Sequence, residues 1–180
     1  MCGRYAFSIA VRELEEIVQK VREELHRTGE VYPTNRMPVL LKGEEAALQR
    51  WGFPAFKGAG VIINARAETA TSKPTFRNCV KEGRCVVPSS GFFEWDQEKR
   101  KYRFNLPGEE TLYMAGLTKV YNGTPCYVIL TTMANPSVAD IHHRMPVVLP
   151  KGKIRDWLDN TELAEEILTA TPPALRREMV

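Results

Sequence analysis

The chain has 180 residues, of which 43% are hydrophobic and 26% are charged, and this size and balance predict one globular domain over residues 1–180. The net charge of +3 is compatible with a polyanionic partner without requiring one. Because no run of about 18 apolar residues and no signal peptide is visible, we expect no membrane segment and a cytoplasmic location.

The first third of the chain is predicted to begin with one amphipathic helix. After Ser8, a candidate N-cap, apolar residues recur at spacings of three and four, which predicts a helix over residues 9–27 that ends near Gly29. Short strands are predicted at residues 37–41, 46–53 and 61–63, with a turn at residues 42–44. Residues 64–78 are polar and predict an extended, ordered loop.

The rest of the chain reads as a run of strands followed by helices. Asn122-Gly123 is a hairpin signal between two of the strands, and Thr161 is a candidate N-cap for the last helix. The strands are expected at residues 84–88, 91–96, 101–106, 112–119, 125–132 and 145–149, and the helices at 154–158 and 162–169. This order predicts an α+β fold: a β-rich domain with a mainly antiparallel, barrel-like twisted sheet, one N-terminal amphipathic helix and short C-terminal helices.

The cysteines do not form a metal-binding pattern. Cys2, Cys79, Cys85 and Cys126 include no C-x-x-C pair and are not interleaved with histidines at zinc-finger spacing. We therefore expect reduced thiols, no metal and no cofactor.

The position of Cys2 next to the start of the chain gives this residue an unusual possible reactivity. If an aminopeptidase removes Met1, Cys2 carries a free α-amine beside its thiol, and this 1,2-aminothiol converts an aldehyde first into an imine and then into a five-membered thiazolidine. The alternative is a small buried side chain, which the first five residues alone favour.

Two further segments carry titratable groups. Glu94 lies between Phe93 and Trp95, where burial would raise its pKa into a range useful for acid–base chemistry. Strand alternation alone favours the alternative that Glu94 faces solvent. His142 and His143 stand beside Arg144, which suits either a general acid with an anion contact or a surface turn.

Polar and aromatic residues elsewhere suggest a nucleic-acid ligand. Asn64 follows an apolar strand and either holds a reactive group or ends the strand in an Asx turn. Four arginines are candidate phosphate contacts and two tryptophans are candidate stacking partners for unpaired bases, although each residue type is more often structural. These residues are Arg4, Arg66, Arg77, Arg144, Trp51 and Trp95.

Taken together in chain order, these segments resemble one family. The segments are MCGRY at 1–5, INARAET at 63–69, RCVVPSSGFFEW at 84–95, LTTMAN at 130–135 and IHHRMPV at 141–147. They are similar to the motifs of the SOS-response-associated peptidase family, also called abasic-site processing proteins. One departure is Tyr32-Pro33-Thr34, where the family usually has A-P-T.

The resemblance implies binding to an abasic site in single-stranded DNA near a single-to-double-strand junction, association with the nucleoid, and a covalent thiazolidine crosslink. It makes Cys2 the nucleophile and implies that Asn64 positions the adduct. Glu94 would assist ring opening and crosslink reversal, and His142 would be the general acid–base at the sugar oxygen.

The resemblance also implies DNA contacts. Arg66 and Arg144 would hold phosphates with Arg4 nearby, Trp95 and Trp51 would stack on nucleotides, and Thr131 or Thr132 would add a backbone contact.

Three functions stay open on the sequence. The first is the crosslinking protein, with an associated lyase activity. The second is a thiol autopeptidase that removes residues ahead of Cys2, and the third is a non-catalytic single-strand-binding module.

Overall fold

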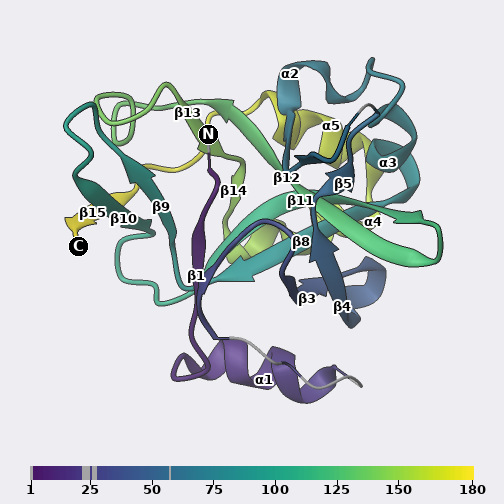
Figure 1. Ribbon diagram of the computed structural model, residues 1–180, viewed down its shortest axis with the longest axis horizontal. Helices are drawn as coiled ribbons and strands as arrows, with labels where there is room; N and C mark the ends of the chain where they lie inside the picture. Colours follow the sequence, from purple (N-terminus) through teal and green to yellow (C-terminus); the bar gives the residue numbers. More distant parts are fainter. Residues whose placement is uncertain (1, 22–24, 26–27, 57) are drawn as a thin grey trace.

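The computed structural model describes residues 2–21, 25, 28–56 and 58–180 (Figure 1). Within these ranges the chain forms a barrel, a second five-stranded sheet and several short helices. Side chains from both sheets pack into one hydrophobic cluster, in which Trp51, Trp157, Tyr5 and Tyr127 are among the largest fully buried residues. The predicted β-rich α+β fold is confirmed.

The barrel closes in the order β12–β4–β3–β8–β11 and back to β12. Its pairs are antiparallel except β12–β4, which is parallel. Two short strands flank the C-terminal half of β12: β7 pairs with it in parallel and β13 pairs antiparallel, while β14 pairs with β11. The bounds are β3 Arg36–Leu40, β4 Ala46–Trp51, β7 Asn64–Arg66, β8 Arg84–Ser89, β11 Leu112–Tyr121, β12 Thr124–Met133, β13 Arg144–Pro146 and β14 Val148–Leu149.

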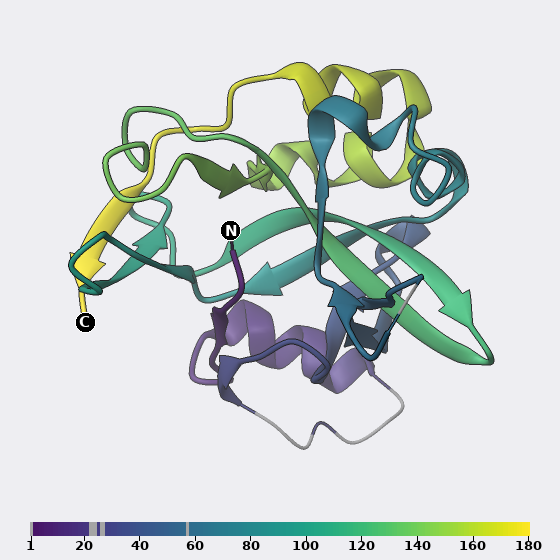
Figure 2. The ribbon, with the colours of Figure 1, turned by 45° about the horizontal axis from the view of Figure 1, so that its top comes forward.

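The second sheet has the order β15–β10–β9–β1–β2 and is antiparallel throughout. Figures 1 and 2 show β15, β10 and β9 on one side of the barrel, with the segment leading into β1 between them and the barrel strands. The bounds are β1 Tyr5–Phe7, β2 Gly29–Val31, β9 Phe92–Trp95, β10 Lys101–Asn105 and β15 Arg176–Met179, and a separate pair joins β5 Phe53–Pro54 to β6 Val61–Ile62.

The predicted helices lie at their expected positions, but some of their end residues differ from the prediction. The N-terminal helix α1 spans Arg12–Lys20 and buries Leu14 and Ile17, and its N-cap is Val11, not the expected Ser8. Residues 22–24 and 26–27 of the predicted helix lie outside the described ranges. Near the C-terminus are the short 3₁₀ helix η2 Lys151–Lys153, α4 Ile154–Asp159 and α5 Thr161–Thr169, and a second 3₁₀ helix, η1 Lys42–Glu44, lies between β3 and β4. The cap of α5 is Asn160, whose side chain accepts from the N–H of Leu163 at 3.1 Å.

The prediction of an extended loop over residues 64–78 is wrong. This stretch contains β7, the short helix α2 Ala67–Ala70 and the start of α3 Arg77–Glu82. Each element is shorter than the windows in which periodicity is visible, so pairing with β12 and packing stabilise them. The exposed strand β15 was also not expected, because its residues show no apolar alternation.

Arg84, the first residue of β8, is structural. Its buried guanidinium donates to the carbonyls of Val80 and Lys81 at the end of α3 and to those of Trp157 and Leu158 in α4. It therefore satisfies the last carbonyls of two helices at once. No helix in the described part of the chain is long and apolar enough to cross a membrane.

Candidate active site

Cys2 lies just ahead of β1 and is fully buried. Its Sγ is 3.9 Å from the carbonyl oxygen of Arg4, a long thiol contact. Burial raises the pKa of the Cys2 thiol far above its usual value, and the nearby charge of Glu94 raises it further. The sulfur is therefore held as a neutral thiol in this arrangement, and its reaction requires a group that takes its proton.

Glu94 is brought beside Cys2 by the pairing of β1 with β9. Tyr5 pairs with Phe92, and the N–H of Phe93 donates to the carbonyl of Arg4 at 2.9 Å. Continuing this antiparallel register places the segment around Cys2 opposite Glu94. Glu94 is only 4% exposed, so the expectation from alternation that it faces solvent is wrong. Burial raises its pKa, and this makes Glu94 a candidate for both donating and accepting a proton.

Asn64 is the first residue of β7 and pairs with Ile129 of β12, so it does not end a strand in an Asx turn. Its Nδ2 donates to the carbonyl of Ile129 at 3.4 Å. Its Oδ1 is buried and has no hydrogen-bond partner among the described residues. A buried amide oxygen without a partner is an available acceptor, and an amine or hydroxyl of a reacting group would satisfy it.

His142 precedes β13 and is fixed by the backbone of Arg144. Its Nδ1 lies 3.0 Å from the N–H and 3.1 Å from the carbonyl of Arg144, so either tautomer finds a partner. Burial lowers the pKa of His142, and its ring stacks on His143 with centroids 4.5 Å apart. The ring is therefore neutral at physiological pH and able to exchange a proton through Nε2.

Strand β12 connects these parts of the site. Its C-terminal half carries β7, with Asn64, on one edge and β13, which follows His142, on the other. Its residue Tyr127 shares a hydrogen bond of 2.6 Å with the hydroxyl of Tyr5 in β1, and both side chains are fully buried. The hydroxyl pair thus ties the strand that follows Cys2 to the strand that positions Asn64 and His142.

The arginines predicted to bind DNA differ in the exposure of their side chains. Arg66 is exposed at the end of β7, and Arg77 is exposed on α3, which both views place away from the segment leading into β1. Arg144 is only 6% exposed and donates to both carboxylate oxygens of Glu68, at 2.6 and 2.9 Å. A phosphate contact by Arg144 therefore requires its release from Glu68, and all three contacts stay predictions.

The two tryptophans separate clearly. The expectation that Trp51 stacks on nucleotides is corrected by the structure, because its ring is fully buried between Tyr5 and Tyr127 and its Nε1 donates to the carbonyl of Ile63 at 3.0 Å. Trp51 thus supports the segment leading to Asn64. Trp95 is half-buried at the surface, with the guanidinium carbon of Arg4 5.3 Å from its ring.

The two threonines are also placed differently. Thr131 is fully buried, and its carbonyl accepts from Arg144 at 2.6 Å, so it offers no free backbone contact in this arrangement. Thr132 is half-buried, and its hydroxyl donates to Glu68 at 3.5 Å.

The sequence did not single out the residues that surround Arg4. Glu30 and Tyr32 contact the Arg4 side chain, and Lys101 contacts Glu30. The one available signal was Tyr32, which stands where the resembled family has alanine. The link between Tyr5 and Tyr127 joins residues 122 positions apart and has no local signature.

Comparisons with known proteins agree on one family and one fold. The family model described as SOS response associated peptidase (SRAP) matches residues 1–180. Abasic site processing protein YoqW of Bacillus subtilis is 32% identical over 183 residues, which cover 88% of this chain and 80% of the relative. Abasic site processing protein HMCES of Gallus gallus is 33% identical over 224 residues, covering 91% of this chain and 67% of the relative. A crystal structure of a protein from Bordetella bronchiseptica has a TM-score of 0.82 at 26% identity and covers 99% of both chains.

Proposed function

The chain belongs to the SOS response associated peptidase (SRAP) family, and from this premise we propose that it processes abasic sites in DNA through a covalent bond to Cys2. The observation that carries the proposal is the pairing of β1 with β9, which sets a buried cysteine at position 2 beside a buried carboxyl group, Glu94. The names of the relatives YoqW and HMCES support the substrate class.

The reaction begins when Met1 is removed and the α-amine of Cys2 becomes free. The opened sugar of an abasic site presents an aldehyde at C1′, and the amine adds to this carbon and expels water to form an imine. The thiol then adds across the C=N bond: sulfur bonds to C1′ and its proton passes to nitrogen. The product is a five-membered thiazolidine, favoured because the second step is intramolecular.

The neighbouring residues supply proton transfers and orientation. Glu94, whose pKa burial raises, assists opening of the sugar ring and relays the thiol proton to the nitrogen during ring closure, and the same transfers in reverse release the crosslink. His142, held neutral by burial, exchanges a proton at the sugar oxygen. The Oδ1 of Asn64, which has no partner among the described residues, accepts a hydrogen bond from the Cys2 amine.

The DNA substrate is a single strand near a junction with a duplex, and the protein associates with the nucleoid when it acts. Exposed Arg66 and half-buried Arg4 contact phosphates, and Trp95 stacks against a nucleotide beside the lesion. The imine intermediate also permits β-elimination of the 3′ phosphate, which is a lyase activity of the same site.

A second candidate function is thiol autopeptidase activity. The name of the family and the position of Glu94 beside Cys2 favour it, because a carboxylate that accepts the thiol proton would also activate sulfur for attack on a peptide carbonyl. This activity would remove residues ahead of Cys2 and would prepare the amine for the crosslinking reaction.

Denaturing gels with a single-stranded oligonucleotide that carries one abasic site test the proposal. The wild-type protein is expected to give a heat-stable shifted band, and Cys2→Ala is expected to give none. Cys2→Ser keeps the amine and is expected to give only an imine, which borohydride traps and heat reverses. Cys79→Ala, which removes another buried free thiol, serves as the matched control and keeps the band. A heat-stable band with Cys2→Ala would refute the proposal.

A further inference from the structure

Three hydrogen-bond donors from separate segments of the chain converge on the carboxylate of Glu30. Arg4, just ahead of β1, donates from Nη1 to Oε2 at 3.1 Å. Lys101, the first residue of β10, donates from Nζ to Oε1, and the hydroxyl of Tyr32 is 3.4 Å from Oε2. The three donors, at positions 4, 32 and 101, form an anion site at the five-stranded sheet, which Glu30 fills.

Aromatic rings hold the two cations of this site in place independently of Glu30. The guanidinium carbon of Arg4 lies 3.9 Å from the centroid of the Tyr32 ring and 5.3 Å from that of Trp95. Lys101 Nζ lies 4.1 Å from the Phe93 centroid. Cation–π contacts of this kind keep a charged head oriented, so the cations stay preorganised if the carboxylate leaves.

The site is accessible and lies close in sequence to the reacting cysteine. The side chains of Arg4, Glu30 and Lys101 are 29%, 33% and 23% exposed, so a ligand from solvent can reach them. Arg4 is two residues from Cys2, and Trp95 follows Glu94. An arginine, a lysine and a phenol are donors that suit a phosphodiester as well as a carboxylate.

Resting on the proposed function, we infer that Glu30 occupies a phosphate subsite beside Cys2, and that a backbone phosphate of the lesion strand replaces it on Arg4 and Lys101 when DNA binds. Every DNA strand must displace Glu30, but only an abasic strand gains the covalent bond to Cys2 in return. Glu30 therefore weakens binding of intact DNA and acts as a specificity determinant.

Two observations agree with this role. The hydrogen bond from Lys101, followed by that from Arg4, holds the pKa of Glu30 below its usual range, so Glu30 stays ionised at neutral pH and competes with phosphate. Arg144 is likewise held by Glu68, a half-exposed carboxylate at another edge of the site. Two of the predicted phosphate-binding arginines are thus paired with acidic side chains in this structure.

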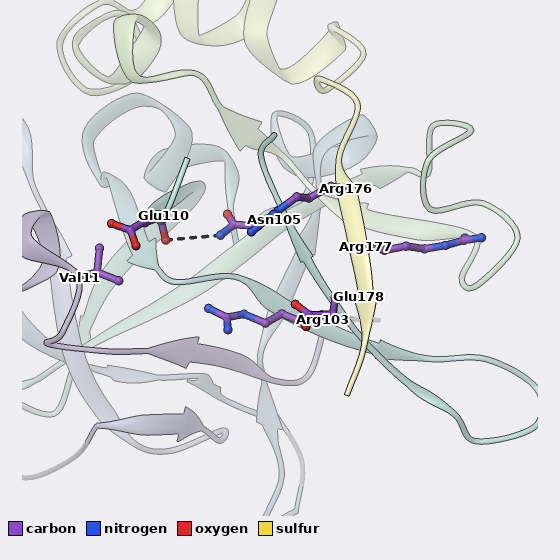
Figure 3. A pocket seen from close by; sticks show the side chains of 7 residues that line it. All are labelled: Val11, Arg103, Asn105, Glu110, Arg176, Arg177 and Glu178. Atoms are coloured by element: carbon purple, nitrogen blue, oxygen red, sulfur yellow. Dashed lines mark hydrogen bonds between the residues drawn. The ribbon is translucent and has the colours of Figure 1, made fainter. Parts of the chain in front are cut away.

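The same sheet offers a matched control. A pocket of about 190 Å³ is lined among others by Arg103, Arg176 and Glu178, and Figure 3 shows these side chains around β10 and β15. Glu178 stands opposite Arg103 in the β10–β15 register and is exposed. Glu178→Gln removes the same charge from the same sheet without touching the Glu30 site.

The experiment measures binding of intact single-stranded DNA by fluorescence anisotropy between about 50 and 200 mM salt. Glu30→Gln is expected to tighten binding by about fivefold or more at low salt and to steepen the salt dependence, because each additional phosphate contact adds roughly 0.7 to the slope. Glu178→Gln is expected to change affinity by less than about twofold. Equal effects of the two variants, or weaker binding by Glu30→Gln, would overturn the inference.

Two further variants keep the test decisive. Glu30→Gln/Lys101→Gln has the wild-type net charge and is expected to lose most of the gain. Lys101→Gln alone is expected to weaken DNA binding and to reduce the dependence of affinity on salt concentration. This variant tests the inference even if Glu30→Gln does not fold. An unchanged affinity of Lys101→Gln would count against the inference. Crosslinking of abasic DNA is measured in parallel. Normal crosslinking with unaltered DNA affinity of Glu30→Gln would reject this inference alone, whereas absence of wild-type crosslinking would reject the proposed function.

Discussion

The hydroxyl pair of Tyr5 and Tyr127 provides a quantitative test of how the segment that carries Cys2 is held. The oxygens are 2.6 Å apart, both side chains are fully buried, and the bond joins β1 to β12. Tyr127→Phe removes one hydroxyl and leaves the other buried without its partner, which costs about 1–3 kcal/mol in the free energy of unfolding. A protein of this size loses roughly 2–4 °C in Tm per kcal/mol, so Tm should fall by roughly 2–12 °C.

The double variant Tyr5→Phe/Tyr127→Phe separates the bond from the packing of the rings. Because both polar groups are removed together, it should lose less stability than the sum of the two single variants, by about 0.5–3 kcal/mol. Urea unfolding of the four proteins measures this coupling. Strictly additive losses would show that the two hydroxyls do not interact and would refute the reasoning.

Three other variants test individual residues. Burial raises the folded-state pKa of Glu94 above its unfolded value, so ionised Glu94 destabilises the fold at neutral pH. Glu94→Gln should therefore raise Tm at neutral pH, lose this gain in Tm below a pH of about 4, and reduce crosslinking. A lower Tm of Glu94→Gln at neutral pH would contradict this. Asn64→Ala should lower the free energy of unfolding by at most about 1.5 kcal/mol in urea, because the hydrogen bond of Asn64 to Ile129 is long at 3.4 Å. The same variant should slow crosslinking by about tenfold or more. An unchanged crosslinking rate would remove Asn64 from the mechanism. Trp51→Ala should lower the free energy of unfolding by about 3–5 kcal/mol, because its ring is buried. Trp95→Ala should chiefly weaken single-strand binding, by about 1–3 kcal/mol in anisotropy titrations. Equal losses of stability in the two variants would contradict the assignment of Trp51 to the core.

Local sequence signals predicted the strands of the barrel well. The Asn122-Gly123 turn is confirmed: both residues have positive φ, 49° and 78°, and Tyr121 pairs with Thr124 across it. The alternating segments around it became β11 and β12. Signals of this kind act over two to ten residues, so they do not depend on the tertiary fold.

Features that depend on contacts between distant residues were not predictable. Alternation in β9 assigns Glu94 and Trp95 to opposite faces but does not say which face is covered, and the segment leading into β1 decides that. The sequence does not distinguish Trp51 from a tryptophan that stacks on bases at the surface, yet Tyr5 and Tyr127 enclose it. These placements follow from the way the second sheet meets the barrel.

The arginines show the same limit. A basic residue in a motif predicts an anion, but it does not say whether that anion is a phosphate or a carboxylate of the same chain. The pairing of Arg144 with Glu68 spans 76 residues, and that of Arg4 with Glu30 spans 26. The motifs therefore predicted which residues to consider for the candidate site, whereas the acidic partners of its arginines required the structure.

Intact mass spectrometry, before and after incubation with a single-stranded oligonucleotide carrying one abasic site, tests the central claim most directly. We expect a protein without Met1 and a one-to-one adduct whose mass is that of protein plus oligonucleotide less one water. The adduct should map to the N-terminal peptide and be absent in Cys2→Ala. A protein with a free N-terminal Cys2 that forms no adduct, or an adduct mapped elsewhere in the chain, would contradict it.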